Sequence, residues 1–313
     1  MAAPTNTLTQ ATQVGFREDL SDVIYRVAPE ETPFMQNIGT SKANAVLHEW
    51  QTENLAAAAA NINVEGNTFT FTTSNITTRL GNTCQIVVKT ASVSETQDAV
   101  KKAGRSSETN RQKVLRGLEG RRDLELAAIG NNASVASGSR ALAGALAWCT
   151  SNTSSGVGGS NGAIQAGGMT AATNGTQRAF TETLLKTALA SMFNNGGKST
   201  QMYMGATQKQ EFSAFTGIAT IRREVTGNNM AVVIGAADGY VSDFGTLSVI
   251  PHAYGLTRDV LGIDPKFWAM APLRSWMSHD LADISDATQF AIVTEQTLES
   301  RNERSSFAIR DLN

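Results

Sequence analysis

The stretch that most limits how this chain can fold is residues 48–74, which read HEWQTENLAAAAANINVEGNTFTFTTS. Short strand-like pieces alternate there with small and polar residues, and large apolar side chains are sparse before Phe69. A segment needs apolar surface to bury if a core is to hold it in place. The sequence therefore indicates that this stretch packs against something other than its own domain.

Runs of strand-forming residues flank this stretch. The segment RLGNTCQIVVKTA that comes after it places Cys84, Ile86 and Val88 at alternate positions, as in a half-buried strand. Two strand-rich runs separated by small and polar residues predict a protruding hairpin over residues 46–80. Phe69 and Phe71 would share one face of a strand. The alanine run would allow a second chain to come close.

The overall composition favours a buried core and argues against strong nucleic-acid binding. The 313 residues are 41% hydrophobic, which suffices for a folded interior. Lys and Arg number 26 against 28 Asp and Glu, which gives a net charge of −2. Without a basic surplus there is no electrostatic basis for general phosphate binding, so any contact with nucleic acid should be weak.

The N-terminal region predicts an arm instead of a targeting segment. Residues 1–15 carry neither a positively charged start nor an apolar run, so we expect no signal peptide or membrane anchor and a cytosol-like compartment. No window reaches the roughly 18 consecutive apolar residues of a membrane-spanning helix. Leu20, Val23 and Val27 come next at helical spacing, and Pro33 predicts a second short helical turn.

A long charged segment predicts a long helix. Ser106 or Ser107 can accept hydrogen bonds from the first free backbone amides, and Gly130 provides a stop, so the helix should span residues 107–129. Its length is then about 35 Å, enough to brace a whole domain. An apolar stripe roughly 120° wide runs along it. The stripe consists of Val114, Leu115, Leu118, Leu126 and Ile129.

The charges of this helix are expected at its surface. Glu119 lies three residues before Arg122, and Arg121 lies four before Glu125. At these spacings opposite charges can pair, and each pair contributes only a few tenths of a kcal/mol. Arg122 and Glu125 interrupt the apolar stripe. The sequence therefore predicts that all four residues form a solvated or subunit-facing charged surface.

The second half opens with a glycine-rich segment, residues 141–177, which is the most loop-like part of the chain. Its glycines do not fit GxGxxG and no GK[ST] comes after them, so it does not indicate a phosphate cradle. A capped helix begins near Thr181, and strands are expected from residue 239 onward. The last residues predict two strands joined by a turn near Asn302. The whole order indicates an α+β fold and not a regular βαβ repeat.

No arrangement of residues points to catalysis. The sequence contains no nucleophile-elbow, zinc-helix, calcium-loop or phosphate-loop motif. Asp280, Asp283 and Asp286 could supply oxygen ligands to a divalent cation, but no glycine or terminal glutamate completes such a loop, which favours an ordinary polar loop. We expect no enzyme activity, no cofactor and no metal, and two free thiols at Cys84 and Cys149.

The order of these segments resembles the major capsid proteins of tailed bacteriophages. The motifs that carry the resemblance are VAPEETPF, HEWQT, RLGN, QDAVKKAGR and TLESRNE, spread over most of the chain. The likeness is to the branch that has no large N-terminal scaffolding domain. It implies the Hong Kong 97 capsid fold and self-assembly through hexamers and pentamers into an icosahedral shell around the double-stranded DNA genome.

The same resemblance implies a division of the chain. Residues 1–45 would form an N-terminal arm, and residues 46–80 the extended loop that lies over an adjacent subunit. Residues 81–140 and 278–313 would form the peripheral domain, which contains the long helix as its spine. Residues 141–277 would form the axial domain around the centres of the capsomers.

The implied partners are first of all copies of the chain itself, in hexameric and pentameric capsomers. A portal, scaffolding proteins and cement or decoration proteins are further partners of such shells. Contact with the packaged DNA would be weak, and no membrane is involved. The implied location is the virion capsid, assembled in the host cytoplasm.

The contacts between subunits should come from apolar residues of the loop. Residues 46–80 contain no lysine. Because relatives that join their subunits by a lysine-to-asparagine bond carry that lysine in the extended loop, we predict a non-covalent shell. An alternative is another homo-oligomeric phage component, such as a tail, decoration or adhesion protein. The expected contact residues are Trp50, Leu55, Ile62, Val64, Phe69 and Phe71.

Overall fold

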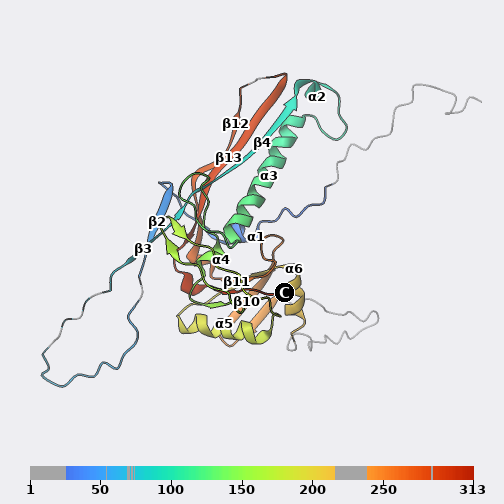
Figure 1. Ribbon diagram of the computed structural model, residues 1–313. Coiled ribbons are helices and arrows are strands. Elements are labelled where there is room, and N and C mark those ends of the chain that lie inside the picture. The colour runs from blue at the N-terminus through green and yellow to red at the C-terminus, as the bar shows by residue number, and fades with distance from the viewer. Residues whose placement is uncertain are drawn as a thin grey trace, which may run out of the picture.

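The computed structural model describes residues 26–53, 55–68, 71, 73, 75–215, 238–282 and 285–313. In Figure 1 an upper part, in which α3 lies beside β4, β13 and β12, stands on a lower part that holds α5, α6 and the C-terminus. A long loop runs out from β2 (Leu47–Thr52) and β3 (Thr78–Thr83). The helix expected around Leu20 and Val23 lies outside the described residues.

A four-stranded sheet forms the upper part, in the order β1-β12-β13-β4. β13 is antiparallel to both β12 and β4, whereas the short β1 runs parallel to β12. The predicted half-buried strand is present as β4, but its buried face is not the expected one: Val87 and Val93 are buried, whereas Ile86 and Val88 are exposed. The bounds are β1 Gly39–Thr40, β4 Gln85–Ser94, β12 Trp268–Asp280 and β13 Ala287–Ser300.

Helix α3 (Glu108–Ile129) packs along one face of this sheet and confirms the predicted long helix. Ser107 caps its start as expected, and the Asp98 carboxylate accepts a hydrogen bond from the first helical N–H at 2.7 Å. Gly120 allows a close approach to the sheet, because a Cβ there would lie 2.8 Å from two ring atoms of Trp276. The helix backbone therefore comes close to the sheet at its middle.

The buried side of α3 does not coincide with the predicted apolar stripe. Val114 and Leu126 are 64% and 47% exposed, whereas Leu124 and Ala128 are fully buried. The difference arises because the helix approaches its neighbours through small residues, Gly120 and Ala128. A hydrophobicity pattern does not count such residues as contact positions.

The lower part is built on a six-stranded sheet, in the order β5-β14-β11-β8-β10-β9. β8 is parallel to β10, and β5 is parallel to β14, while the other neighbours are antiparallel. Helix α5 (Glu182–Asn194) packs against β14, and Thr181 caps it as predicted. The strand bounds are β5 Thr153–Ser154, β8 Gln201–Met204, β9 Gly239–Ser242, β10 Gly245–Pro251, β11 Val260–Ile263 and β14 Phe307–Ile309.

Short elements complete the chain. A small hairpin, β6 with β7, lies within the glycine-rich segment. Among the other short elements, α2 packs against β4 and α3, and α4 packs against α3 and β13. Their bounds are α2 Glu95–Ala99, α4 Ala145–Trp148, β6 Ile164–Gln165, β7 Gly168–Met169, α6 Ala206–Ser213, and the single-turn helices η2 Pro265–Phe267 and η3 Glu303–Ser305.

Two strands lie in a different sheet from the one expected. The sequence assigns residues 268–277 to the second half, but β12 begins at Trp268 and belongs to the upper sheet. β14 does not turn back along β13; it pairs with β11 and β5. Phe307 gives the reason, because its buried ring fills the space over Gly262, where a Cβ would lie 2.0 Å from the ring.

The glycine-rich segment folds around a carboxylate of its own chain. Asp311 is 1% exposed and accepts hydrogen bonds from Gly156 N at 2.9 Å and from Gly175 N at 2.8 Å. Arg258 donates to the same carboxylate at 3.1 Å. A Cβ on Gly156 would lie 2.0 Å from Thr176 O, so this approach needs glycine. The segment thus fixes the last residues of the chain in the lower part.

Candidate functional site

The predicted hairpin is present, and its middle stands away from the body. β2 (Leu47–Thr52) and β3 (Thr78–Thr83) pair antiparallel over their whole length. Between them the described residues form no helix or strand, and Figure 1 shows this part running out as a loop. Residues 53–77 are the tip of the extended loop. The structure therefore separates a paired base from an unpaired tip.

Apolar side chains of the extended loop are left in solvent. Leu55, Ile62, Val64 and Phe71 are between 80% and 99% exposed. Burying a side chain of this kind stabilises a protein by about 1.5–3 kcal/mol relative to leaving it exposed. Phe69, the other phenylalanine expected to make contacts, lies outside the described residues. The loop thus carries apolar surface that its own chain does not cover.

Trp50 differs from this exposed set. Its ring packs against Trp148, with the ring centroids 5.3 Å apart. Trp148 is 2% exposed and belongs to the core formed with α1, α3 and α4. The structure therefore places Trp50 in the base of the hairpin, where it contacts its own chain.

Asn82 ties the base to two other segments. Its side-chain amide donates to Ala143 O at 3.0 Å and to Leu298 O at 2.8 Å. Its side-chain oxygen accepts from Ala143 N at 2.9 Å and from Thr83 N at 3.0 Å. Asn82 is fully buried, and both amide protons and the oxygen are used. β3 is therefore fixed to β13 and to the start of the lower part.

Glu299 of β13 holds the other strand of the base. His48 Nε2 lies 3.4 Å from Glu299 Oε2, and Arg301 donates to Oε1 at 3.2 Å. Hydrogen bonding by His48, with contributions from Ser41 and Arg301, lowers the pKa of Glu299 to about 2 although the group is partly desolvated. The carboxylate is therefore ionised at neutral pH. The loop projects from a base that is held on both of its strands.

A buried carboxylate organises the N-terminal segment. Helix α1 (Pro33–Asn37) confirms the predicted short helical turn, and Phe34 is fully buried. The Thr32 side chain, at the N-cap, accepts no capping hydrogen bond from the first backbone amides of the helix. Glu125 of α3 takes that role, since it accepts from Phe34 N at 2.7 Å and from Met35 N at 2.9 Å. These are amides that a helix start leaves without an internal partner.

His252, just after β10, completes this cluster. Its Nε2 lies 2.8 Å from Glu125 Oε1, and both side chains are 0% exposed. Its Nδ1 lies 2.6 Å from Tyr254 O. Glu125 therefore joins the N-terminal segment, α3 and the lower sheet. The prediction that Glu125 pairs with Arg121 at the surface is wrong, because the amides of α1 draw the carboxylate inward.

The second predicted pair on α3 is also wrong. Glu119 accepts from Arg116 at 2.6 Å. The Arg122 guanidinium lies 5.5 Å from the ring centroid of Tyr254, because this side of α3 faces the segment just after β10. Arg121 is exposed and borders a shallow hollow between α3 and β12. Glu119 and Arg121 lie at the surface as expected, but neither makes the ion pair that was predicted for it.

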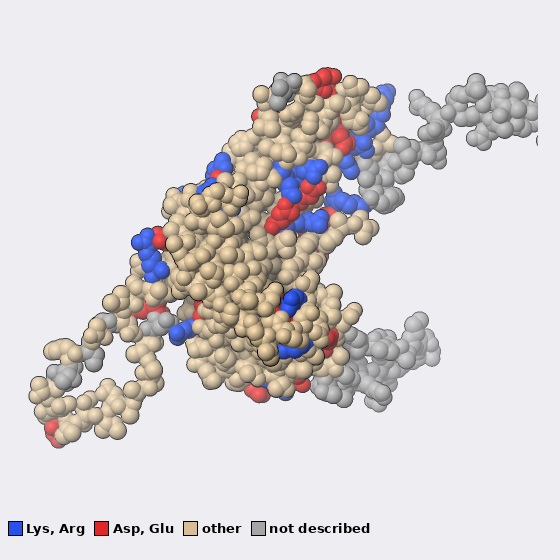
Figure 2. All heavy atoms as spheres, viewed as in Figure 1, with Lys and Arg blue, Asp and Glu red and all other residues tan. Residues whose placement is uncertain are grey.

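Charges of both signs interleave on the face drawn in Figure 2. Around α3 many of them are paired, such as Lys89 with Asp123 at 2.6 Å and Lys113 with Asp280 at 2.9 Å. Asp280 is one of the aspartates considered as metal ligands, and Asp283 lies outside the described residues. Paired charges do not produce the field of one sign that holds DNA tightly. Weak contact with DNA stays a prediction.

Asp259 makes the stability of the lower part depend on pH. Burial raises the pKa of Asp259 to about 6, although Arg310 and a hydrogen bond from the backbone of Asp311 favour the ionised form. A folded pKa above the ordinary value of 3.8 means that the stabilising contribution is fully present below that value and is lost as the pH rises through about 6.

We therefore expect Asp259→Asn to raise the free energy of unfolding at pH 7 by up to about 3 kcal/mol. The effect should be much smaller at pH 4, where the folded protein already carries a neutral carboxyl group. Urea unfolding at the two pH values measures this difference. An equal change at both would contradict the assignment of a raised pKa to Asp259.

Comparison with known proteins identifies the family to which this chain belongs. The model of the SU10 major capsid protein family matches residues 3–313. The chain belongs to the SU10 major capsid protein family. The major capsid protein of Escherichia phage Phieco32 is 32% identical over 114 residues, which make up 36% of this chain and 32% of the length of that relative. The resemblance stated from the motifs is therefore confirmed.

Solved phage capsids share the fold of this capsid protein. The capsid asymmetric unit of cyanophage A-1(L) aligns with a TM-score of 0.68 and 13% identity, covering 97% of this chain and 99% of that chain. A phage G structure of major capsid and decoration proteins aligns with a TM-score of 0.55 and 11% identity, covering 99% of each. These likenesses confirm the predicted α+β capsid fold of the Hong Kong 97 type.

The family places the capsid protein in the virion capsid, as expected. Over the part of the chain that the structure describes, no helix combines the length and the apolar character that crossing a bilayer requires.

The motifs that carried the resemblance lie at junctions of the capsid protein. VAPEETPF contains the buried Phe34, RLGN contains Asn82, and QDAVKKAGR contains Asp98, the acceptor at the start of α3. TLESRNE contains Glu299 and Glu303, and Glu303 accepts from the backbone amides of residues 150 and 151 at 3.1 and 3.0 Å. Phe34, Asn82 and Glu303 therefore connect segments that are far apart in the chain. Asp98 instead links α2 to the start of α3, ten residues later.

Proposed function

We propose that this capsid protein assembles with copies of itself, through hexameric and pentameric capsomers, into the icosahedral shell that encloses double-stranded phage DNA. The observation that carries the proposal is the extended loop, in which Leu55, Ile62, Val64 and Phe71 project into solvent from an anchored base. Several large apolar side chains exposed on one projecting segment indicate an interaction site. A neighbouring copy supplies the cover that the single chain lacks.

The arrangement of the two sheets supports a division into peripheral and axial parts. We assign α3 and the four-stranded sheet to the peripheral part, and the six-stranded sheet to the axial part. Residues 268–280 then join the peripheral part and residues 301–313 the axial part, which moves both boundaries from those expected. The segment around α1 bridges them, because Asn37 also donates to Tyr203 of β8 at 3.0 Å.

We further propose a shell held by non-covalent contacts. Residues 46–80 contain no lysine that could form a side-chain cross-link from the loop. Mature particles should therefore give one monomer band on a denaturing gel after boiling in reductant. A ladder of bands above the monomer would contradict this part of the proposal.

Other components complete the proposed particle. A portal and scaffolding proteins would direct assembly, and a cement or decoration protein, such as those that the phage G structure contains, would reinforce a shell without cross-links. Contact with the packaged DNA would be weak, in keeping with a net charge of −2. The role is structural, and it involves no cofactor.

Negative-stain electron microscopy of the purified chain, at rising protein concentration, tests self-assembly. The expected particles are closed shells or hexameric capsomers. Stable monomers, or fibres and rods of the kind formed by tail and adhesion proteins, would contradict the proposal. Light scattering coupled to gel filtration measures the mass of each species on the same sample.

A further inference from the structure

Strand β4 lies at the edge of the four-stranded sheet and offers a free row of backbone groups. Glu95 N donates to Asp286 O at 3.4 Å, in register with the pairing of Ala287 and Ser94. In an antiparallel pair every second residue faces the partner strand. The odd-numbered residues of β4 therefore bond to β13, and the even-numbered ones point away from it.

The outward groups are the N–H and C=O of Ile86, Val88, Thr90 and Ser92. Immediately before these residues, Cys84 N donates to Val46 O at 2.8 Å. The outward side of the strand is therefore paired up to Cys84 and free after it. Among the described residues no strand pairs with β4 on this side. The free edge extends over most of a ten-residue strand, about 33 Å long.

This edge lacks the features that normally prevent strand pairing. Edge strands are usually protected by proline, by bulges, by charges or by a covering segment. On the other edge of the sheet, β1 pairs with the start of β12, and Pro272 and two register shifts interrupt the rest of that strand. The register of β4 is continuous, and the side chain of Lys89 is paired with Asp123 at 2.6 Å. Ile86 and Val88 are left 40% and 49% exposed.

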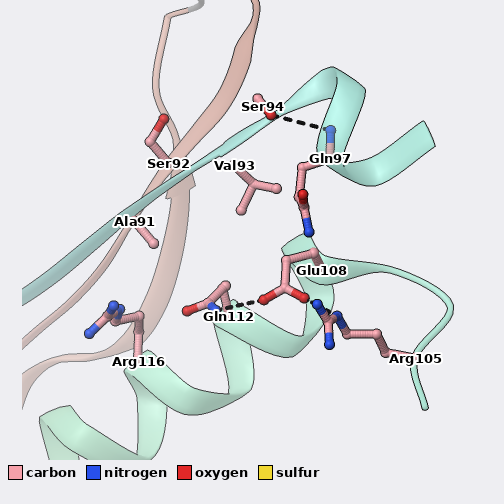
Figure 3. Close-up of a pocket in the computed structure, with 9 residues that line it drawn as sticks. All are labelled: Ala91, Ser92, Val93, Ser94, Gln97, Arg105, Glu108, Gln112 and Arg116. Atoms are coloured by element: carbon pink, nitrogen blue, oxygen red, sulfur yellow. Dashed lines mark hydrogen bonds and ion pairs between the residues drawn. The ribbon is translucent and has the colours of Figure 1, made fainter. Parts of the chain in front are cut away.

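A groove beside the far end of the edge leaves room for a further strand. It measures about 410 Å³ and lies between β4 and α3. Figure 3 shows Val93 pointing from β4 towards α3, with Gln112 and Arg116 of the helix on the opposite side of the opening. Helix α3 therefore does not close the space next to the last residues of β4.

We propose that the β4 edge accepts residues 55–64 of the extended loop of a second copy as an added antiparallel strand. This inference rests on the proposed self-assembly and adds to it the surface on which the loop binds. The segment, LAAAAANINV, is uncharged and as long as β4, and all of it is described without helix or strand. Added strands bind through main-chain hydrogen bonds, and alternate side chains select the register.

The side chains specify how the segment aligns. Ile62 and Val64 are two residues apart, as are Ile86 and Val88. If Ile62 lies opposite Val88, antiparallel pairing puts Val64 opposite Ile86, so exposed apolar side chains meet on one face. The alanine run then lies along Thr90 and the residues after it, where its small side chains fit beside α3.

The occupant has to come from another copy. In Figure 1 the extended loop of the same chain runs away from β4, α2 and the upper end of α3. Its base is fixed by the pairing of β2 with β3, with Asn82 buried at the end nearest the body. A chain whose loop is directed away from its own β4 leaves that edge for the loop of a neighbour.

Hydrogen exchange read by mass spectrometry tests this contact on the full chain. In assembled shells the outward amides of Ile86, Val88, Thr90 and Ser92 should exchange at least tenfold more slowly than in the free subunit. The same sample is viewed by electron microscopy, which reports separately whether shells form. Shells in which these amides exchange as fast as in the free subunit would overturn the proposed site and leave the assembly itself unaffected.

Cysteine cross-linking tests the alignment. Ile62→Cys combined with Val88→Cys should give disulfide-linked oligomers on mild oxidation of shells. The control, Asn63→Cys with Val88→Cys, places one thiol on the opposite face and should give at least fivefold less product. Cys84 and Cys149 do not interfere, because both are fully buried and burial raises the pKa of their thiols to about 11 and about 12. Equal yields from the two pairs would overturn the proposed register.

Discussion

Deletion of residues 56–68 is expected to give a folded, soluble subunit that no longer forms closed shells. The deleted residues pair with no strand of the described body, and Ile62 and Val64 within them are 90% and 80% exposed. The hydrophobic core clusters and the base of the hairpin do not depend on them. The free energy of unfolding should therefore change by less than about 0.5 kcal/mol, while shells disappear from electron micrographs.

A pair of substitutions gives the matched control for this deletion. Ile62→Ser with Val64→Ser keeps the loop length and removes the apolar contacts, and it should reduce the yield of shells at least tenfold. The variant Ala57→Ser with Ala58→Ser changes the same number of residues in the same extended loop. Its yield of shells should stay close to that of the natural chain. Loss of the folded subunit on deletion would mean that the stretch belongs to its own core.

Glu125→Ala is expected to destabilise the subunit strongly. The carboxylate accepts from the amides of Phe34 and Met35 and lies 2.8 Å from His252, all in a buried site. Removing it leaves these groups without a partner, and breaking a buried charged network of this kind costs about 3–5 kcal/mol. Urea unfolding measures the change.

Glu119→Ala is the control on the same helix. Glu119 is partly exposed and pairs with Arg116, and surface pairs contribute about 0–1 kcal/mol. The loss of stability from Glu125→Gln should lie between the losses from Glu119→Ala and Glu125→Ala, because an amide oxygen still accepts one or more of the hydrogen bonds. Similar losses from Glu119→Ala and Glu125→Ala would contradict the role assigned to the buried carboxylate.

Features determined by neighbouring residues were predictable from the sequence. Ser107 and Gly130 bound α3 because capping is a local property of the backbone. The base of the hairpin follows from the alternation of strand residues, and the exposure of Ile62 and Val64 follows from the shortage of core residues around them. In each case the signal lies within a few residues of the element that it specifies.

Features determined by distant contacts were not predictable. Glu125 interrupts an apolar stripe, and only the position of α1, about ninety residues earlier in the chain, explains its burial. Phe307 joins the lower sheet because Gly262 leaves space for its ring, a match that no periodicity reveals. The interruption of the stripe by a carboxylate was nevertheless a usable signal, since a buried charge needs a partner.

A cryo-electron microscopy reconstruction of the assembled particle tests the central claim most directly. We predict a closed icosahedral shell in which the extended loop of each subunit lies on a neighbouring copy, with Ile62 and Val64 covered and a fifth strand beside β4. An open tube or fibre, or a shell in which each loop folds back on its own subunit, would contradict this account.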